Sequence, residues 1–144
     1  MKTRFSSLVS VKKNIMQKSE RLLQTANKNL LNAKIALQDS LSLLQNIITP
    51  KEGSMAEFLA NRSLLDSQRS IIEHNEGWVD YAQKEVLEAK EQLKRDMIEY
   101  EKFKYLELQE IEKILKEQKI QEAKDLDEVA LMTHAKKITM RQAS

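Results

Sequence analysis

The only proline of the chain and one of its two glycines lie within six residues, Thr49-Pro50-Lys51-Glu52-Gly53-Ser54. Pro50 cannot sit inside a helix without removing a backbone hydrogen bond and clashing with the preceding turn. Gly53 can adopt dihedral angles that other residues avoid. Because the sequence on both sides has helical periodicity, this cluster predicts one tight reversal between two long helices, the first ending near Ile48.

Two interpretations of the start of the second helix are open. Ser54 can be the N-cap, because Glu57 follows it at the spacing of a capping box. Alternatively, Thr49 is the cap, Pro50 is the first helical residue and Glu52 is the capping-box partner. Both interpretations place the reversal in the same six residues, so the chain is predicted to be a hairpin with a shorter first arm.

The predicted fold class is all-α, with two long helices that form an antiparallel coiled-coil hairpin in which the second helix is longer. Charged residues make up 32% of the chain and aromatic residues 5%, which suits long solvated helices better than a globular core. We expect a single domain over 1–144, with a helix at about 3–48, a turn at 49–54, a helix at about 55–138 and a tail at 139–144.

Apolar residues in the second arm recur every seven positions, which predicts a coiled-coil seam. Polar residues interrupt a second seam position at Asn61, Gln68, Asn75 and Asp96, and such residues can fix the register of the two helices. The residues assigned to the structural seam are Leu22, Leu37 and Leu44 in the first arm and Phe58, Leu65, Ile72, Val79, Val86 and Leu93 in the second.

The apolar and small residues of the first arm recur in steps of three, four and four, which favours a nearly straight stripe. When the chain is folded back at the turn, residue i is expected near residue 102 − i, so that Leu44 faces Phe58 and Leu37 faces Leu65. The stripe runs through Leu8, Val11, Ile15, Ser19, Leu22, Ala26, Leu30, Ala33, Leu37, Leu41, Leu44 and Ile48.

Charge is unevenly distributed, although the net charge is only +2. Residues 1–48 carry eight basic and two acidic side chains, a net charge of +6, and residues 85–128 carry nine basic and fourteen acidic ones, a net charge of −5. Two interpretations are open: the charges belong to solvated helix faces, or the basic first arm and the acidic second arm attract each other. The expected register places Lys12 and Lys13 close to Glu88 and Glu91.

In the same register, residues from about Phe103 onward have no partner in the hairpin. They still carry an apolar stripe, which indicates an external partner or self-association. Its members are Leu106, Leu108, Ile111, Ile114 and Leu115.

No residue pattern predicts catalysis or a cofactor. His74 and His134 are far apart and lack matching carboxylates, and the absence of cysteine excludes a thiolate metal site. There is no glycine-rich phosphate loop and no apolar run long enough to span a membrane. The basic tail residues Lys136, Lys137 and Arg141 lack the interleaved aromatics of a nucleic-acid interface. We therefore expect no enzyme activity, cofactor, metal, nucleic acid or membrane insertion.

Two end motifs are more specific than the periodicity. Near the start stands Arg4-Phe5-x-x-Leu8-x-x-Val11-Lys12, and near the end stands Lys124-Asp125-Leu126-Asp127-Glu128-Val129-Ala130, followed by Lys136-Lys137. Together with a long hairpin that has one turn rich in Pro, Gly and Ser, these motifs resemble the flagellar FliJ family over nearly the whole chain.

The resemblance implies a non-catalytic component of the flagellar type III protein export apparatus. Such a protein is a central stalk that inserts into the hexameric export ATPase and promotes its assembly and activity. It also implies contacts with the export-gate membrane protein and the export chaperones, and a cytoplasmic location at the inner-membrane export gate.

The resemblance assigns partner binding to six residues, Phe5, Leu8, Leu126, Asp127, Glu128 and Ala130. Leu126 would pack against the partner, whereas Asp127 and Glu128 would meet basic side chains or helix N-termini. Three alternatives stay open. Phe5 and Leu126 can be seam residues with the two acids solvated. The protein can be a structural or adaptor coiled coil that acts through self-association or another helical partner. A prefoldin-like holding chaperone with the tip as client site is less favoured, because the tip has few apolar residues.

Overall fold

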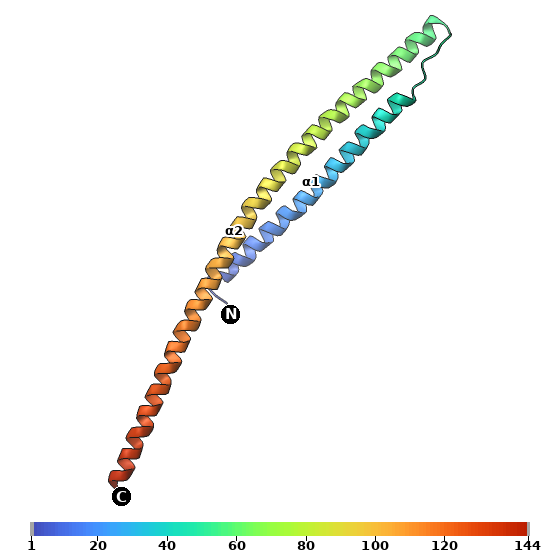
Figure 1. The fold of residues 1–144 in the computed structure, drawn as a ribbon. Coiled ribbons are helices and arrows are strands. Elements are labelled where there is room, and N and C mark those ends of the chain that lie inside the picture. The colour runs from blue at the N-terminus through green and yellow to red at the C-terminus, as the bar shows by residue number, and fades with distance from the viewer. Residues whose placement is uncertain (1, 144) are drawn as a thin grey trace. The chain divides into compact units, whose positions relative to one another are not determined.

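The computed structural model describes residues 2–143 and contains two helices, α1 (Ser6–Asn46) and α2 (Met55–Ala143) (Figure 1). The prediction of an all-α hairpin with a longer second helix is confirmed. The contacts divide the chain into two compact units, one of Met1–Lys12 with Glu99–Ser144 and one of Lys13–Ile98. The two helices are antiparallel within each unit, and the single-domain organisation stays a prediction.

The helix ends differ from the expected ones by a few residues. α1 ends at Asn46, two residues before the predicted Ile48. The expected tail from residue 139 is wrong as far as Ala143, because α2 continues to that residue. The last stretch contains neither glycine nor proline, so nothing in its sequence ends the helix.

The start of α2 follows the first of the two interpretations. The Ser54 hydroxyl accepts a hydrogen bond from the backbone N–H of Glu57 at 3.3 Å, which is the N-cap interaction. Gly53 has a φ of 153°, and a Cβ at this position would collide with the carboxylate of Glu57. The capping by Thr49 with Pro50 in the first helical turn is therefore wrong, since both residues lie outside the helices.

In the Lys13–Ile98 unit the turn is a longer, non-helical loop rather than a tight reversal. The side-chain amide of Asn61 donates a hydrogen bond to the carbonyl of Ile48 at 3.0 Å, so the loop runs back beside the second turn of α2. α2 consequently starts beyond the end of α1 (Figure 1). Residues 55–60 are all exposed, and Phe58 lies outside the seam instead of facing Leu44.

This loop changes the register of the hairpin. The side-chain amide of the buried Gln68 donates to the carbonyl of Ser40 at 2.8 Å, where the expected register places Arg62. The expected pair Leu37–Leu65 is displaced in the same direction. An extended loop residue advances the chain by more than twice the helical rise of about 1.5 Å. The loop therefore shifts the pairing toward later residues of α2.

Polar side chains of the second seam position connect the two helices. Asn75 donates its amide to the carbonyl of Ala36 at 3.3 Å, and the buried Ser19 donates its hydroxyl to the carboxylate of Asp96. Each of these bonds joins a particular pair of positions, so a slip of the helices would leave polar groups without partners. The seam polar residues thus specify the register.

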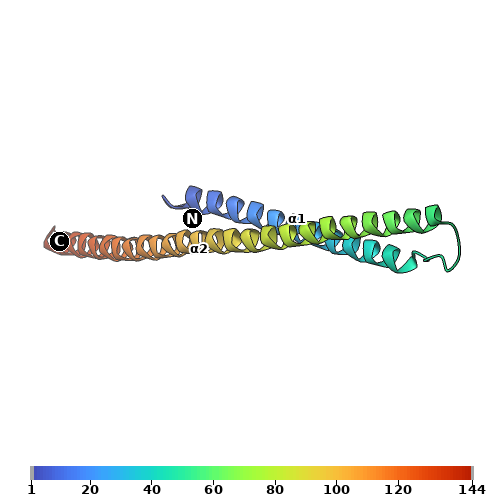
Figure 2. The same cartoon turned by 90° about the horizontal axis from the view of Figure 1, so that it is seen from above.

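The packed face of α2 keeps the heptad spacing from Asn61 to Asp96. Ala82 and Val86 are among its most buried residues, and Figure 2 shows α1 crossing from one side of α2 to the other. Leu65, Ile72, Val79, Val86 and Leu93 are all buried or half-buried.

The packed face of α1 differs from the expected stripe. Leu23 is half-buried, whereas Leu22 is 54% exposed, so the structure places Leu23 rather than Leu22 in the seam. The packed residues of α1 are spaced by three and four residues in alternation, a heptad, instead of by three, four and four. A helix that coils around α2 must have the same seven-residue period as α2. The buried and half-buried seam positions of α1 in this unit are Met16, Ser19, Leu23, Ala26, Leu30, Ala33, Leu37, Ser40 and Leu44.

Within residues 2–143, no helix combines the length and the apolar character needed to cross a membrane.

Candidate partner-binding surface

Hydrogen bonds of Thr3 and Ser6 fix the start of α1, next to the N-terminal motif. The hydroxyl of Thr3 accepts a hydrogen bond from the backbone N–H of Phe5 at 3.1 Å, and the hydroxyl of Ser6 accepts one from the N–H of Thr3 at 2.8 Å. Ser6 also donates its hydroxyl to Glu107 at 3.4 Å. The first turn of α1 is thereby tied to α2 within the unit of Met1–Lys12 and Glu99–Ser144.

Two basic side chains of the N-terminal segment meet acids of α2. Arg4 lies 3.6 Å from Glu110 and Lys12 lies 3.7 Å from Glu99. The attraction of the basic arm to the acidic arm is therefore observed, but Glu99 replaces the expected partners of Lys12, Glu88 and Glu91. These pairs are partly exposed and contribute only about 0–1 kcal/mol each.

Aromatic rings support the same contacts. The guanidinium of Arg4 lies 4.9 Å from the centre of the Phe5 ring, and the ammonium of Lys12 lies 5.6 Å from that of Phe103. Both rings are half-buried. Leu8, in contrast, is exposed on the outer surface of α1, so only Phe5 of the N-terminal pair packs in the hairpin.

The paired section is longer than the sequence predicted. Residues from Phe103 were expected to lack a partner, yet Phe103, Leu106, Ile111 and Ile114 are half-buried. The later register explains this difference, because it brings the N-terminal residues beside Glu107 and Glu110. Of the expected unpaired stripe, Leu108 and Leu115 are exposed.

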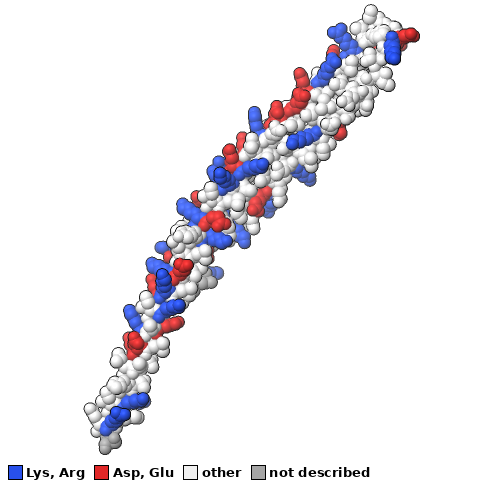
Figure 3. Space-filling model, in the orientation of Figure 1, with Lys and Arg blue, Asp and Glu red and all other residues white. Residues whose placement is uncertain are grey.

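The unpaired part of α2 begins after Ile114. Every residue from 115 to 142 is exposed, and we call these residues the free segment. The part of the free segment from residue 129 onward carries three basic residues and no acidic residue (Figure 3). An isolated helix of this kind has little stability of its own in water, and its apolar side chains are uncovered. They are Leu115, Ile120, Leu126, Val129, Leu131, Met132, Ile138 and Met140.

The C-terminal motif lies in the middle of the free segment. Leu126 and Val129 lie on one face, since residues three apart are neighbours on a helix, and Ala130 adjoins them. Asp127 and Glu128 lie on the side of the helix turned away from this face, since successive residues are rotated by about 100°. Neither acid forms an ion pair or hydrogen bond with any residue from 2 to 143. The motif therefore combines an open apolar face with two unpaired carboxylates.

The structure does not bring the two end motifs together. Arg4 of the first motif lies beside Glu110, and Leu126 of the second follows sixteen residues later. At a rise of about 1.5 Å per residue, this corresponds to roughly 24 Å along α2. Phe5 and Leu8 thus belong to one surface, and the four C-terminal residues to another.

Sequence reasoning missed the residues that hold the N-terminus in place, namely Thr3, Ser6, Glu107 and Glu110. Thr3 is a residue type favoured at N-caps, which was a usable signal, whereas the two glutamates follow only from the register. Among the described residues, no group of three or more His, Asp or Glu side chains could hold a metal ion.

A family model described as "Flagellar FliJ protein" matches residues 1–139. No curated protein and no solved structure matches the chain. The matched range covers both end motifs, the loop and both helices almost completely. On this basis, the chain belongs to the flagellar FliJ protein family.

Proposed function

We propose that this chain is the central stalk of the flagellar type III export ATPase. In this role it inserts into the hexameric ATPase, promotes its assembly and activity, and connects it to the export-gate membrane protein and the export chaperones. Family membership supports the coarser part, since FliJ proteins are non-catalytic components of the flagellar export apparatus. The site of action would be the cytoplasmic side of the inner membrane, at the export gate.

The observation that best supports a partner at the C-terminal end is the free segment itself. It exposes large apolar side chains along a helix that no other part of residues 2–143 covers. Uncovered apolar surface of this extent is typical of interaction sites. A single helix is about 10–12 Å wide, so it can enter a narrow axial opening that would exclude a globular domain.

The proposal gives different roles to the residues of the C-terminal motif. Leu126 and Ala130 pack against apolar side chains of the ATPase. Asp127 and Glu128 pair with basic side chains or helix N-termini of the same partner. Their lack of ion pairs within the described chain leaves both carboxylates available for such contacts.

The double variant Asp127→Ala/Glu128→Ala tests this assignment. Loss of one partner from a buried charge pair costs about 2–5 kcal/mol, so stimulation of the purified ATPase should need roughly 30-fold to 4,000-fold more stalk protein. Helicity should stay unchanged, because exposed charges contribute about 0–1 kcal/mol to folding. The measurement is ATP hydrolysis across a titration of stalk protein at low and moderate salt.

The matched control is Glu117→Ala/Glu122→Ala, which removes two exposed acids from the same free segment and should stimulate like the parent. Unchanged stimulation by the Asp127/Glu128 variant would exclude these acids as contacts. Absence of stimulation by the parent protein, with an ATPase that is active, would contradict the stalk function.

A second candidate function uses the same uncovered side chains differently. If two copies of the free segment cover each other, the protein is an adaptor that acts through self-association. Sedimentation of the parent chain across a hundredfold concentration range separates the two functions. A dimer that is lost on deletion of the free segment, without ATPase stimulation, would favour the adaptor.

A further inference from the structure

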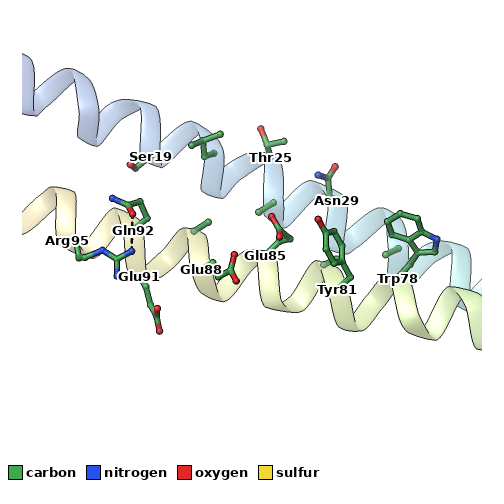
Figure 4. Close-up of a pocket in the computed structure, with 15 residues that line it drawn as sticks. Ser19, Thr25, Asn29, Trp78, Tyr81, Glu85, Glu88, Glu91, Gln92 and Arg95 are labelled. Carbon is green, nitrogen blue, oxygen red and sulfur yellow. Dashed lines mark hydrogen bonds between the residues drawn. The ribbon is translucent and has the colours of Figure 1, made fainter.

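A groove of about 670 Å³ lies between α1 and α2 within the Lys13–Ile98 unit (Figure 4). It arises because small residues occupy the seam positions of both helices over several turns, and such side chains do not fill the space between two helix backbones. The small residues that line the groove are Ser19, Ala26, Ala33, Ala82 and Ala89.

Large apolar side chains form the rims of the groove. Leu22 stands on the α1 side, and Trp78 and Tyr81, which are 53% and 56% exposed, stand on the α2 side. The two aromatic rings meet edge to face at 5.9 Å, and the indole N–H of Trp78 donates to His74 at 2.7 Å. These contacts hold the rings in place, although about half of each residue is exposed.

The charges along the groove are mostly negative. Glu85, Glu88 and Glu91 line it, and none of them forms an ion pair or hydrogen bond with residues 2–143. The one basic residue of the lining, Arg95, donates to Gln92 at 2.9 Å. The groove thus has an apolar floor, an aromatic rim and carboxylates that have no partner in the chain.

We propose that this groove binds an amphipathic α-helix of a partner protein, whose apolar stripe is flanked by Lys or Arg residues. The small residues recur every seven positions on α1 at 19, 26 and 33 and on α2 at 82 and 89. Seven residues are two turns of an α-helix, so a docking helix can place one apolar side chain above each alanine level of the groove. The bound helix would then be the third helix of a bundle.

The aromatic rim and the carboxylates select the charge of the partner helix. Lysine and arginine interact favourably with the faces of Trp78 and Tyr81 and pair with Glu85 and Glu88. A second copy of the chain fits less well, because a two-fold contact brings each groove against its own counterpart and opposes like charges. The groove is separate from the end motifs, so this inference goes beyond the proposed function.

Trp78 is the only tryptophan of the protein, so its fluorescence reports directly on the rim of the groove. The probe is a synthetic 21-residue helical peptide without tryptophan, with Ala and Leu on its apolar stripe and Lys on both flanks. Added to the full-length chain, it should shift the emission of Trp78 to shorter wavelength in a saturable manner. A peptide with Glu in place of every Lys should bind at least 10-fold more weakly.

The charge reversal Glu85→Lys/Glu88→Lys should invert this preference and bind the Glu peptide more tightly than the Lys peptide. The matched control Glu117→Lys/Glu122→Lys changes the net charge equally outside the groove and should behave like the parent. The variant Ala89→Leu places a larger side chain on the floor of the groove and should lower the affinity for the Lys peptide at least 10-fold. Circular dichroism establishes that each variant is as helical as the parent.

Three results would overturn the proposal. One is a Lys peptide that leaves the emission of Trp78 unchanged. Another is an equal loss of binding in the Glu117/Glu122 control, which would mean attraction by net charge alone. The third is a concentration-dependent emission shift of the chain without peptide, together with dimerisation in sedimentation, which would make a second copy the occupant.

Discussion

Val86 and its neighbour Leu87 offer a sharp test of which face of α2 packs against α1. Val86 is 6% exposed in the seam of the Lys13–Ile98 unit, whereas Leu87 is 61% exposed. Replacing either residue by aspartate introduces the same charge at adjacent positions of the same helix. The difference between the two variants therefore measures burial rather than helix propensity or net charge.

The expected loss for Val86→Asp has two parts. Burial of a valine side chain contributes about 1.5–3 kcal/mol, which the variant loses. Desolvation of a carboxylate adds several kcal/mol when no partner is present. Because the seam of a two-helix hairpin lies near water and the charge can partly reach it, we expect a total of about 3–5 kcal/mol. Leu87→Asp should cost less than about 1 kcal/mol.

Thermal melts followed by circular dichroism at 222 nm measure both variants. In a chain of this size, about 1 kcal/mol corresponds to roughly 3–4 °C in Tm, so Val86→Asp should melt about 10–20 °C below the parent and Leu87→Asp within about 4 °C of it. Equal melting of the two variants, or a larger loss for Leu87→Asp, would refute the assigned seam.

Three further predictions follow from the fold. Leu23→Asp should lower the Tm by at least about 8 °C, and the exposed Leu22→Asp by less than about 4 °C. The reverse order in thermal melts would show that Leu22 is the seam residue, as the sequence predicted. Hydrogen exchange should show one fast-exchanging interior segment at 47–54. The amides around Gly77 should be protected, because α2 is continuous there. A second fast-exchanging segment at Gly77 would mean that α2 is two helices. Deletion of 116–143 should leave the Tm of the hairpin within about 3 °C of the parent, since these residues are exposed, and a larger loss in differential scanning calorimetry would show that they support the fold.

The interruption between the helices and the packed face of α2 could be predicted from the sequence. The N-cap at Ser54 depends on a residue three positions later in the chain, so local sequence contains the signal for it, although the same sequence also allowed a cap at Thr49. The α2 seam through Ile72 and Val86 follows a strict heptad, and only one face of that helix has this period. Both features depend on order along a single helix, which a sequence displays directly.

The positions of the end motifs were also predictable, but the extent of pairing was not. The Leu126-Asp127-Glu128 motif was expected beyond the hairpin, and it lies in the free segment. The unpaired part begins after Ile114 rather than near Phe103, because the register is later than expected. Register depends on how the eight residues 47–54 run in space, and no pattern within either helix records that path.

The seam of α1 and the groove were decided only by tertiary structure. α1 has apolar residues on two adjoining faces, and Leu22 and Leu23 are equally acceptable to an isolated helix. The seven-residue period of α2 selects Leu23 and leaves Leu22 on the rim of a groove. That groove exists because alanines of two helices that are distant in sequence face each other at the same height along the hairpin. Which residues face each other depends on how both helices pack, so neither segment of sequence predicts the groove alone.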